Sequence, residues 1–205
     1  MRHARLVGDA WEAYRRTTIG KDGTEVLLRQ YVNGDVVVAF RGTEKNFTDI
    51  LSDLAGWPDR HPTLGFCHNG FLEGVLAVWP EVTHWLGLAK ATRVWFTGHS
   101  KGGSQACIAA GLLMTTWPNP DVGLVTFGAA GAGTWKLGRV LAAAQPVHYR
   151  NGVDCVPSHP WWTGYPSGYT QLGEWDFAAR YIDLSDRFLD HRIAEYEMAV
   201  NKINA

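Results

Sequence analysis

The stretch VWFTGHSKGG, residues 94–103, decides how this chain of 205 residues folds. Its apolar first half is typical of a β-strand, and the small, apolar residues 104–110 that follow are typical of a helix. A G-x-S-x-G pattern between a strand and a helix predicts a nucleophile elbow, a sharp turn that lifts a serine hydroxyl above a sheet. Gly98 and Gly102 let the backbone turn tightly around Ser100. The alternative is a glycine-rich turn with an idle serine.

Strand-like and helix-like segments alternate along the rest of the chain, which predicts an α/β fold with a mostly parallel central sheet. Asn33-Gly34 separates two strand-like runs and indicates a hairpin turn. The expected strands are 25–31, 35–40, 93–97, 122–127 and 147–150, and the expected helices are 9–16, 71–88 (kinked or split at Pro80), 101–116, 134–144 and 186–201, with Asp9 and Ser185 as caps.

Composition excludes several classes of protein. The net charge is −1, so nothing in the charge balance favours nucleic acid or an anionic membrane surface as a partner, and no apolar run is long enough to span a membrane. The three cysteines (Cys67, Cys107 and Cys155) are widely spaced, which predicts neither a disulfide framework nor a zinc site. The length predicts one domain over 1–205. No signal peptide is visible at the N-terminus, so we expect a cytoplasmic protein, with export by a signal-independent route left open.

A serine nucleophile needs an imidazole to accept its proton and a carboxylate to orient that imidazole. In α/β-hydrolase-type folds they follow in the order Ser, Asp, His. Asp154 comes after the expected strand 147–150 and a turn, and His191 lies near the C-terminus. His159 competes with His191, but it is only five residues past Asp154. The alternatives are a surface aspartate in a glycine turn and an exposed histidine at a helix start.

Two backbone donors are needed to hold the oxyanion of a tetrahedral intermediate. One is expected from Lys101, directly after the nucleophile, and the second from the loop 41–43 at the end of an early buried strand, where Thr43 adds a hydroxyl. An ordinary strand-ending turn is the alternative for this loop.

An amphipathic helix is expected next, around residues 44–58. Phe47, Ile50, Leu51 and Leu54 recur at the spacing of one helix face. Because this helix follows the oxyanion loop, we interpret it as a lid whose apolar face contacts substrate and opens onto a lipid surface. A helix packed on the core is the alternative.

Tryptophans gather in the loop between the acid and the base. Trp161 and Trp162 begin an aromatic stretch, 161–169, that predicts a wall for an acyl chain or a patch for a membrane interface. Trp57, also beside a proline, is expected to be exposed with them. A loop packed on the core is the alternative reading of the pattern.

Several of the segments described above together resemble the class 3 lipase family, the fungal-lipase-like branch of the α/β-hydrolases, over residues 36–196. The resemblance implies an α/β-hydrolase fold, Ser100, Asp154 and His191 as nucleophile, acid and base, Thr43 and Lys101 as oxyanion donors, and no cofactor or metal. The matching blocks are 37–43 for the oxyanion strand, 47–54 for the lid, 67–72 for a helix start, 98–103 for the elbow, 125–128 for a later strand, 151–157 for the acid and 190–191 for the base.

Some features depart from that family. Lys101 stands where leucine is usual, which places a cation beside the expected acyl site, and the chain is shorter than secreted fungal members and lacks their disulfides.

The expected activity is hydrolysis of carboxylic esters by a triacylglycerol lipase, a phospholipase A1 or a short-chain esterase acting on a lipid or small ester, with transient contact to a lipid interface. A non-catalytic module that binds lipid or a protein partner, and an acyltransferase or peptidase, are the alternatives.

Overall fold

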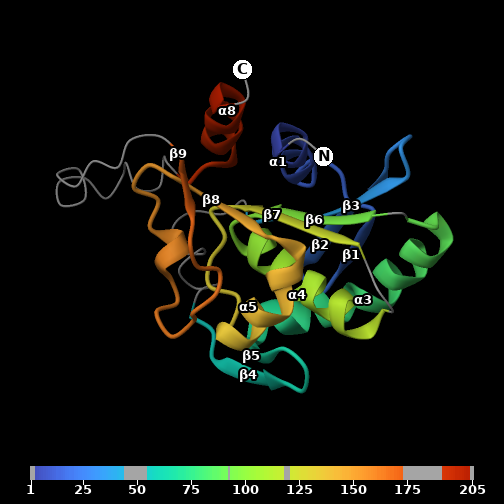
Figure 1. Ribbon diagram of the computed structural model, residues 1–205, viewed down its shortest axis with the longest axis horizontal. Coiled ribbons are helices and arrows are strands. Elements are labelled where there is room, and N and C mark those ends of the chain that lie inside the picture. The colour runs from blue at the N-terminus through green and yellow to red at the C-terminus, as the bar shows by residue number, and fades with distance from the viewer. Residues whose placement is uncertain (1–2, 44–54, 92, 118–120, 173–190, 204–205) are drawn as a thin grey trace.

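A mixed sheet of seven strands forms the centre of the molecule (Figure 1), in a computed structural model that describes residues 3–43, 55–91, 93–117, 121–172 and 191–203. The first three strands pair in antiparallel fashion, and the remaining ones join β3 in parallel. In sheet order the strands are β1 (Ile19–Lys21), β2 (Thr24–Gln30), β3 (Asp35–Phe40), β6 (Arg93–His99), β7 (Val122–Phe127), β8 (Val147–Asn151) and β9 (Thr170–Leu172). The mostly parallel sheet predicted from the sequence is therefore confirmed.

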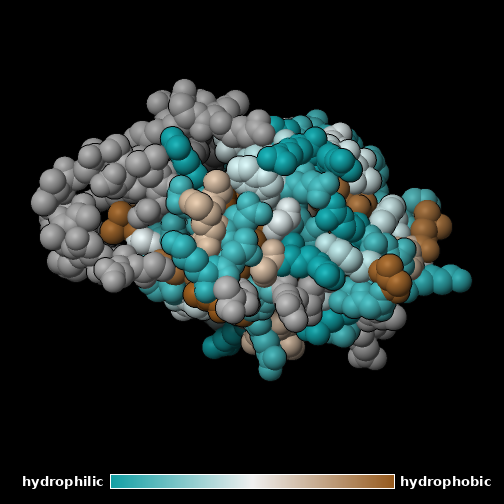
Figure 2. All heavy atoms as spheres, turned by 90° about the horizontal axis from the view of Figure 1, so that it is seen from above, coloured by the Kyte–Doolittle hydropathy of each residue, from teal (hydrophilic) through white to brown (hydrophobic). Residues whose placement is uncertain are grey.

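Helices cover both faces of this sheet. α1 (His3–Glu12) and α8 (Ile193–Ile203) lie side by side on one face, and α3 (Asn69–Ala89), α4 (Lys101–Thr116) and α5 (Trp135–Leu141) lie on the other (Figure 1). Figure 2 looks onto the face of α1 and α8, where mostly hydrophilic side chains meet solvent. Two apolar cores result, one under each layer of helices.

Strand β3 supplies both cores because successive side chains of a strand point to opposite faces. Val36, Val38 and Phe40 join the core under α3 and α4, whereas Val37 and Ala39 join the core under α1 and α8. The continuous apolar run 36–40 in the sequence is thus explained by burial on both faces.

The predicted start of one helix at Asp9 and a split of another at Pro80 were both wrong. α1 begins at His3, so Asp9 is not a cap; it lies inside the helix, buried, where its carboxylate accepts hydrogen bonds from Arg29 and Tyr31. α3 continues through Pro80 without a break. Pro80 has no N–H to donate to the carbonyl of Leu76, and both residues lie on the exposed face of the helix.

Several short elements carry no periodic signal and were not predicted. β4 (Pro58–His61) and β5 (Gly65–His68) form a separate hairpin, and single bridges join Cys67 to Gly133 and Gly133 to Tyr165.

The predicted lid helix lies mostly outside the described residues, which leave out 44–54 and with them Phe47, Ile50 and Leu51. Residues 55–57 are described and are irregular. Short 3-10 helices span Ala142–Ala144 and Val156–Ser158, and Ser185 and 186–190 lie outside the described residues.

Acid should weaken the fold through His148, which is buried on β8. Its Nδ1 lies 2.7 Å from the Thr126 hydroxyl and its Nε2 lies 2.8 Å from the Tyr165 hydroxyl, and burial lowers its pKa to about 4. The unfolded chain binds a proton here below its ordinary pKa of about 6.5, while the folded chain does not. His148 therefore does not reduce the stability of the fold above about pH 6.5. The free energy of unfolding decreases as the pH falls from that value toward 4.

Urea denaturation at about pH 7 and pH 5 measures this loss, which we expect to be about 2 kcal/mol in the free energy of unfolding. A His148→Asn variant should lower stability at both pH values but show a smaller difference between them. His84→Gln, which changes an exposed histidine, is the matched control. An unchanged pH dependence in His148→Asn would contradict the prediction.

Candidate active site

Ser100 sits at the sharp turn between β6 and α4. Its backbone has φ 56° and ψ −128°, a conformation that non-glycine residues rarely adopt and that is strained. The turn closes so tightly that a Cβ on Gly98 would lie 2.4 Å from the backbone of Gly102, and a Cβ on Gly102 would lie 2.2 Å from the Phe40 carbonyl oxygen. Both glycines of the G-x-S-x-G pattern are thus required by close backbone contacts, as the sequence predicted.

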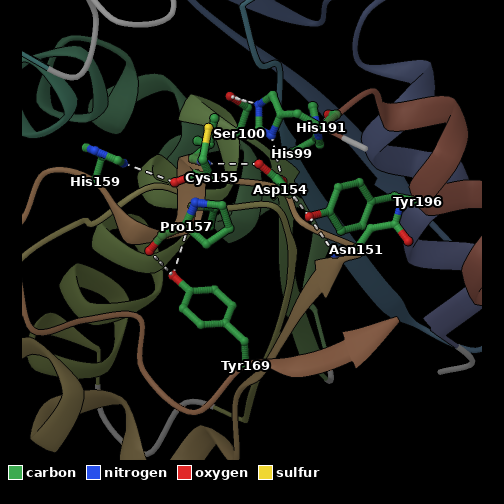
Figure 3. A network of polar contacts seen from close by, with 12 residues as sticks. His99, Ser100, Asn151, Asp154, Cys155, Pro157, His159, Tyr169, His191 and Tyr196 are labelled. Carbon is green, nitrogen blue, oxygen red and sulfur yellow. Dashed lines mark hydrogen bonds and ion pairs between the residues drawn. The ribbon is translucent and has the colours of Figure 1, made fainter. Parts of the chain in front are cut away.

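The three residues proposed as nucleophile, base and acid meet in one chain of hydrogen bonds (Figure 3). His191 Nε2 lies 2.8 Å from Ser100 Oγ, and His191 Nδ1 lies 2.8 Å from Asp154 Oδ2. All three residues are buried. The competing His159 is exposed, and its Nδ1 pairs with the Cys155 carbonyl, 3.0 Å away within its own turn.

The carboxylate of Asp154 is held on both oxygens. The Val156 N–H donates to Oδ1 (2.9 Å), and the Tyr196 hydroxyl donates to Oδ2 (2.6 Å) beside His191. Tyr196 is itself fixed, because its oxygen accepts the N–H of Asn151 (3.0 Å). Burial, followed by the Asp154 charge, raises the pKa of Tyr196 well above its usual range, so the hydroxyl remains a donor.

Tyr196 is a site residue that the sequence interpretation missed. It lies on the buried face of α8 with Ile193 and Val200, at a helical spacing that is by itself typical of core residues. Its contact with Asp154, 42 residues away, is decided by the packing of α8 on the sheet.

The expected oxyanion donors lie on two adjoining segments. Lys101 begins α4, so its N–H is among the unpaired donors at the positive end of that helix. Parallel pairing of β3 with β6 places Phe40 opposite Gly98, which brings the loop 41–43 beside the elbow. Thr43 ends this loop and is half-buried.

The Lys101 side chain does not remain beside the serine. Its Nζ donates to the Gly23 carbonyl (3.1 Å), in the turn between β1 and β2. The ammonium group is therefore tied to that turn and not to the elbow.

The predicted aromatic residues border a pocket of about 370 Å³ lined by 55–57 and 159–162. Trp161 is 87% exposed and Trp57 is 78% exposed. Trp162 is half-buried; its Nε1 donates to the Gly56 carbonyl (3.3 Å) and its ring stacks toward His68. Two tryptophans thus face solvent, while Trp162 also supports the loop.

Within the ranges that the structure describes, no cluster of three or more histidine, cysteine or acidic side chains is arranged to bind a metal ion. The Cys67 and Cys107 thiols are buried, which raises their pKa values and keeps them protonated. Serine, imidazole and carboxylate in this order are the groups that perform nucleophilic acyl transfer.

The model of the family described as "Lipase (class 3)" matches residues 37–164, more than half of the chain. The chain belongs to the class 3 lipase family. The match spans the oxyanion loop, the elbow and the Asp154 loop, and it ends before His191. The resemblance inferred from the sequence is thereby confirmed.

Solved structures show the same fold. The Rhizomucor miehei lipase propeptide complex shares 21% identity, over 78% of this chain and 56% of that chain, with a TM-score of 0.65. A structure titled as a triacylglycerol lipase whose catalytic centre is a serine protease triad shares 22% identity, over 77% of this chain and 63% of that one, with a TM-score of 0.62. Both confirm the α/β-hydrolase fold.

Among curated proteins, toxin TseL of Vibrio cholerae is 31% identical over 97 residues. The match covers 46% of this chain and only 15% of TseL. None of the described helices is both long and apolar enough to cross a membrane.

Proposed function

We propose that the chain hydrolyses carboxylic esters of lipids through an acyl-enzyme intermediate. The observation that carries the proposal is the unbroken hydrogen-bond chain from Ser100 through His191 to Asp154, built on a strained elbow. Strain at a buried serine is retained only where the surrounding structure holds it, and such strain gathers at functional sites.

In the proposed reaction, Ser100 Oγ attacks the ester carbonyl carbon while His191 Nε2 accepts the hydroxyl proton. The carbonyl oxygen becomes an oxyanion, which the Lys101 N–H and the Thr43 residue stabilise. The C–O bond to the alcohol then breaks, and His191 returns its proton to the departing alcohol. Water, deprotonated by His191, attacks the acyl-enzyme, and the acid leaves as Ser100 recovers its proton. Asp154 holds the imidazole in place and stabilises the positive charge that His191 carries after it takes a proton from Ser100 or from water.

Family membership supports a lipid ester as the substrate, and one structural neighbour is titled a triacylglycerol lipase. Phospholipase A1 and short-chain esterase activities use the same acyl chemistry on other esters. The exposed Trp57 and Trp161 favour a lipid, because indole rings bury apolar area while their N–H groups stay hydrated at a membrane interface. We therefore propose that these tryptophans, with Trp162 and the lid residues Phe47, Ile50 and Leu51, contact aggregated substrate.

Hydrolysis of p-nitrophenyl esters of short to long acyl chains, below and above their aggregation threshold, tests this proposal. We expect a rise in rate on aggregated long-chain esters. The Trp161→Ala variant should lower that rate by about three- to tenfold, because burying about 40 Å² of the indole at about 25 cal/mol per Å² is worth about 1 kcal/mol. It should leave hydrolysis of dissolved short-chain esters unchanged.

The matched control is Leu88→Ala, which removes an exposed apolar side chain at the end of α3. Equal losses on dissolved and aggregated esters would contradict interfacial contact. A wild type that turns over dissolved esters only would indicate a short-chain esterase, and one that turns over none would favour the lipid- or partner-binding module.

A further inference from the structure

His99, the residue before the nucleophile, makes two hydrogen bonds that ester chemistry does not use. Its Nε2 lies 2.6 Å from the backbone oxygen of His191, and its Nδ1 lies 2.8 Å from the Tyr14 hydroxyl. The side chain is buried, with its ring centroid 4.7 Å from that of His191 (Figure 3). The side chain cannot turn back to the hydroxyl of the adjacent Ser100, so the sequence indicates no role for His99 as the base.

The partners determine where the proton of His99 lies. A backbone carbonyl only accepts, so Nε2 carries the hydrogen and donates it to His191. The Nδ1 of a neutral ring then accepts from the Tyr14 hydroxyl. Burial, and next the neighbouring His191 imidazole, lowers the pKa of His99 well below its usual range, although the bond to the His191 backbone opposes this. The ring is therefore neutral and held in one tautomer.

Tyr14 contacts a second part of the site. A Cβ built on Gly42 would lie 2.1 Å from the Tyr14 hydroxyl and 2.6 Å from the His99 carbonyl oxygen. The loop 41–43 therefore lies directly against the same hydroxyl that orients His99. Tyr14 follows α1, so the N-terminal helix reaches both the oxyanion loop and the histidine.

We infer that Tyr14 and His99 are positioning residues, which hold the backbone of His191 and the loop of Gly42 in place around Ser100. His99 is covalently joined to Ser100, so its bond to the His191 carbonyl sets the base relative to the nucleophile. His191 itself lies just before α8. The inference rests on the proposed function, since it concerns the geometry of that triad.

Small displacements of a base are costly in rate, since about 1 Å can cost a factor of about 10². We expect His99→Phe, which keeps a flat ring but removes both nitrogens, to lower kcat by about 10- to 100-fold and to change KM by less than about twofold. His99→Gln, whose amide N–H can still donate toward His191, should recover part of this loss. Tyr14→Phe, which removes one oxygen, should lower kcat by about three- to tenfold.

The groups that face His99 are the His191 imidazole, the Tyr196 ring with its centroid 5.6 Å away, and the Tyr14 hydroxyl, with the Arg41 guanidinium 6.0 Å from the Tyr14 ring. Because His99 stays neutral, its substitution removes hydrogen bonds and no charge.

The test measures kcat and KM on a dissolved p-nitrophenyl ester and the rate at which Ser100 reacts with a fluorophosphonate, with thermal unfolding as a check of folding. Tyr31→Phe, which removes a hydroxyl that binds Asp9 away from the site, is the control and should keep the wild-type rates. Slower reaction of Ser100 in Tyr14→Phe and His99→Phe, with recovery in His99→Gln, is the expected result.

Wild-type rates in folded Tyr14→Phe would overturn the inference while leaving the proposed function intact. A wild type that neither hydrolyses esters nor reacts with the fluorophosphonate would overturn the proposed function, and the inference with it. If His99→Phe does not fold, Tyr14→Phe decides.

Discussion

A Ser100→Ala variant is expected to lose ester hydrolysis by a factor of about 10³ to 10⁶, the range seen when the nucleophile of a serine triad is removed. Only Oγ is deleted. The remaining Cβ occupies the same space at the elbow, so the strained backbone and the packing of Gly98 and Gly102 are kept. The measurement is kcat/KM on a dissolved p-nitrophenyl ester, where interfacial effects do not enter.

Ser158→Ala is the control for this variant, since Ser158 is an exposed serine in the turn after Asp154. It should retain the wild-type rate. Retention of more than about a tenth of the activity in a folded Ser100→Ala protein would exclude Ser100 as the nucleophile.

Asp154→Asn is expected to lower kcat by about 10³- to 10⁴-fold, as wrong orientation of the histidine does in serine hydrolases. Three donors converge on this carboxylate: the Val156 N–H, the Tyr196 hydroxyl and, in the productive tautomer, the N–H at Nδ1 of His191. An asparagine side chain offers one oxygen and one NH₂ group. In either orientation of the asparagine, its NH₂ group faces at least one of these donors. We expect His191 to rotate or to change its tautomer, because this removes the repulsion at the lowest cost in energy.

Steady-state kcat of Asp154→Asn, compared with Asp59→Asn, measures the effect, because Asp59 is exposed on β4. Circular dichroism of the folded variant separates a catalytic loss from unfolding. A loss of less than about tenfold would show that Asp154 does not orient the base.

The sequence predicts those parts of the site whose residue patterns lie within a short segment of the chain. The elbow at Ser100 has its pattern within one short segment, and the Asn33-Gly34 turn lies between two strand-like runs. Asp154 and His191 followed from chain order and from the ends of the expected elements, and the structure brings them to 2.8 Å contacts. The roles of Phe47, Ile50, Leu51, Trp161 and Trp162, and a cytoplasmic location, stay predictions.

The parts that could not be predicted depend on contacts between distant segments. His99 cannot reach the hydroxyl of its immediate neighbour, and its two partners lie 85 and 92 residues away along the chain. β4, β5 and β9 are three or four residues long, too short for a period of two to be distinguished from a loop. The carboxylate of Asp9 was interpreted as a helix cap, although its partners lie on β2 and beyond it.

The sequence by itself determined the elbow around Ser100, the family and the mostly parallel sheet, because steric limits at the elbow and burial of alternating side chains act on neighbouring residues. Only the tertiary structure decided which groups hold Ser100, Asp154 and His191 in place. Tyr14, His99 and Tyr196 come from three separate elements, and their hydroxyl and ring nitrogens find partners only when α1 and α8 pack on the same face of the sheet. Hydrogen bonds act over about 3 Å, so no spacing along the chain encodes them.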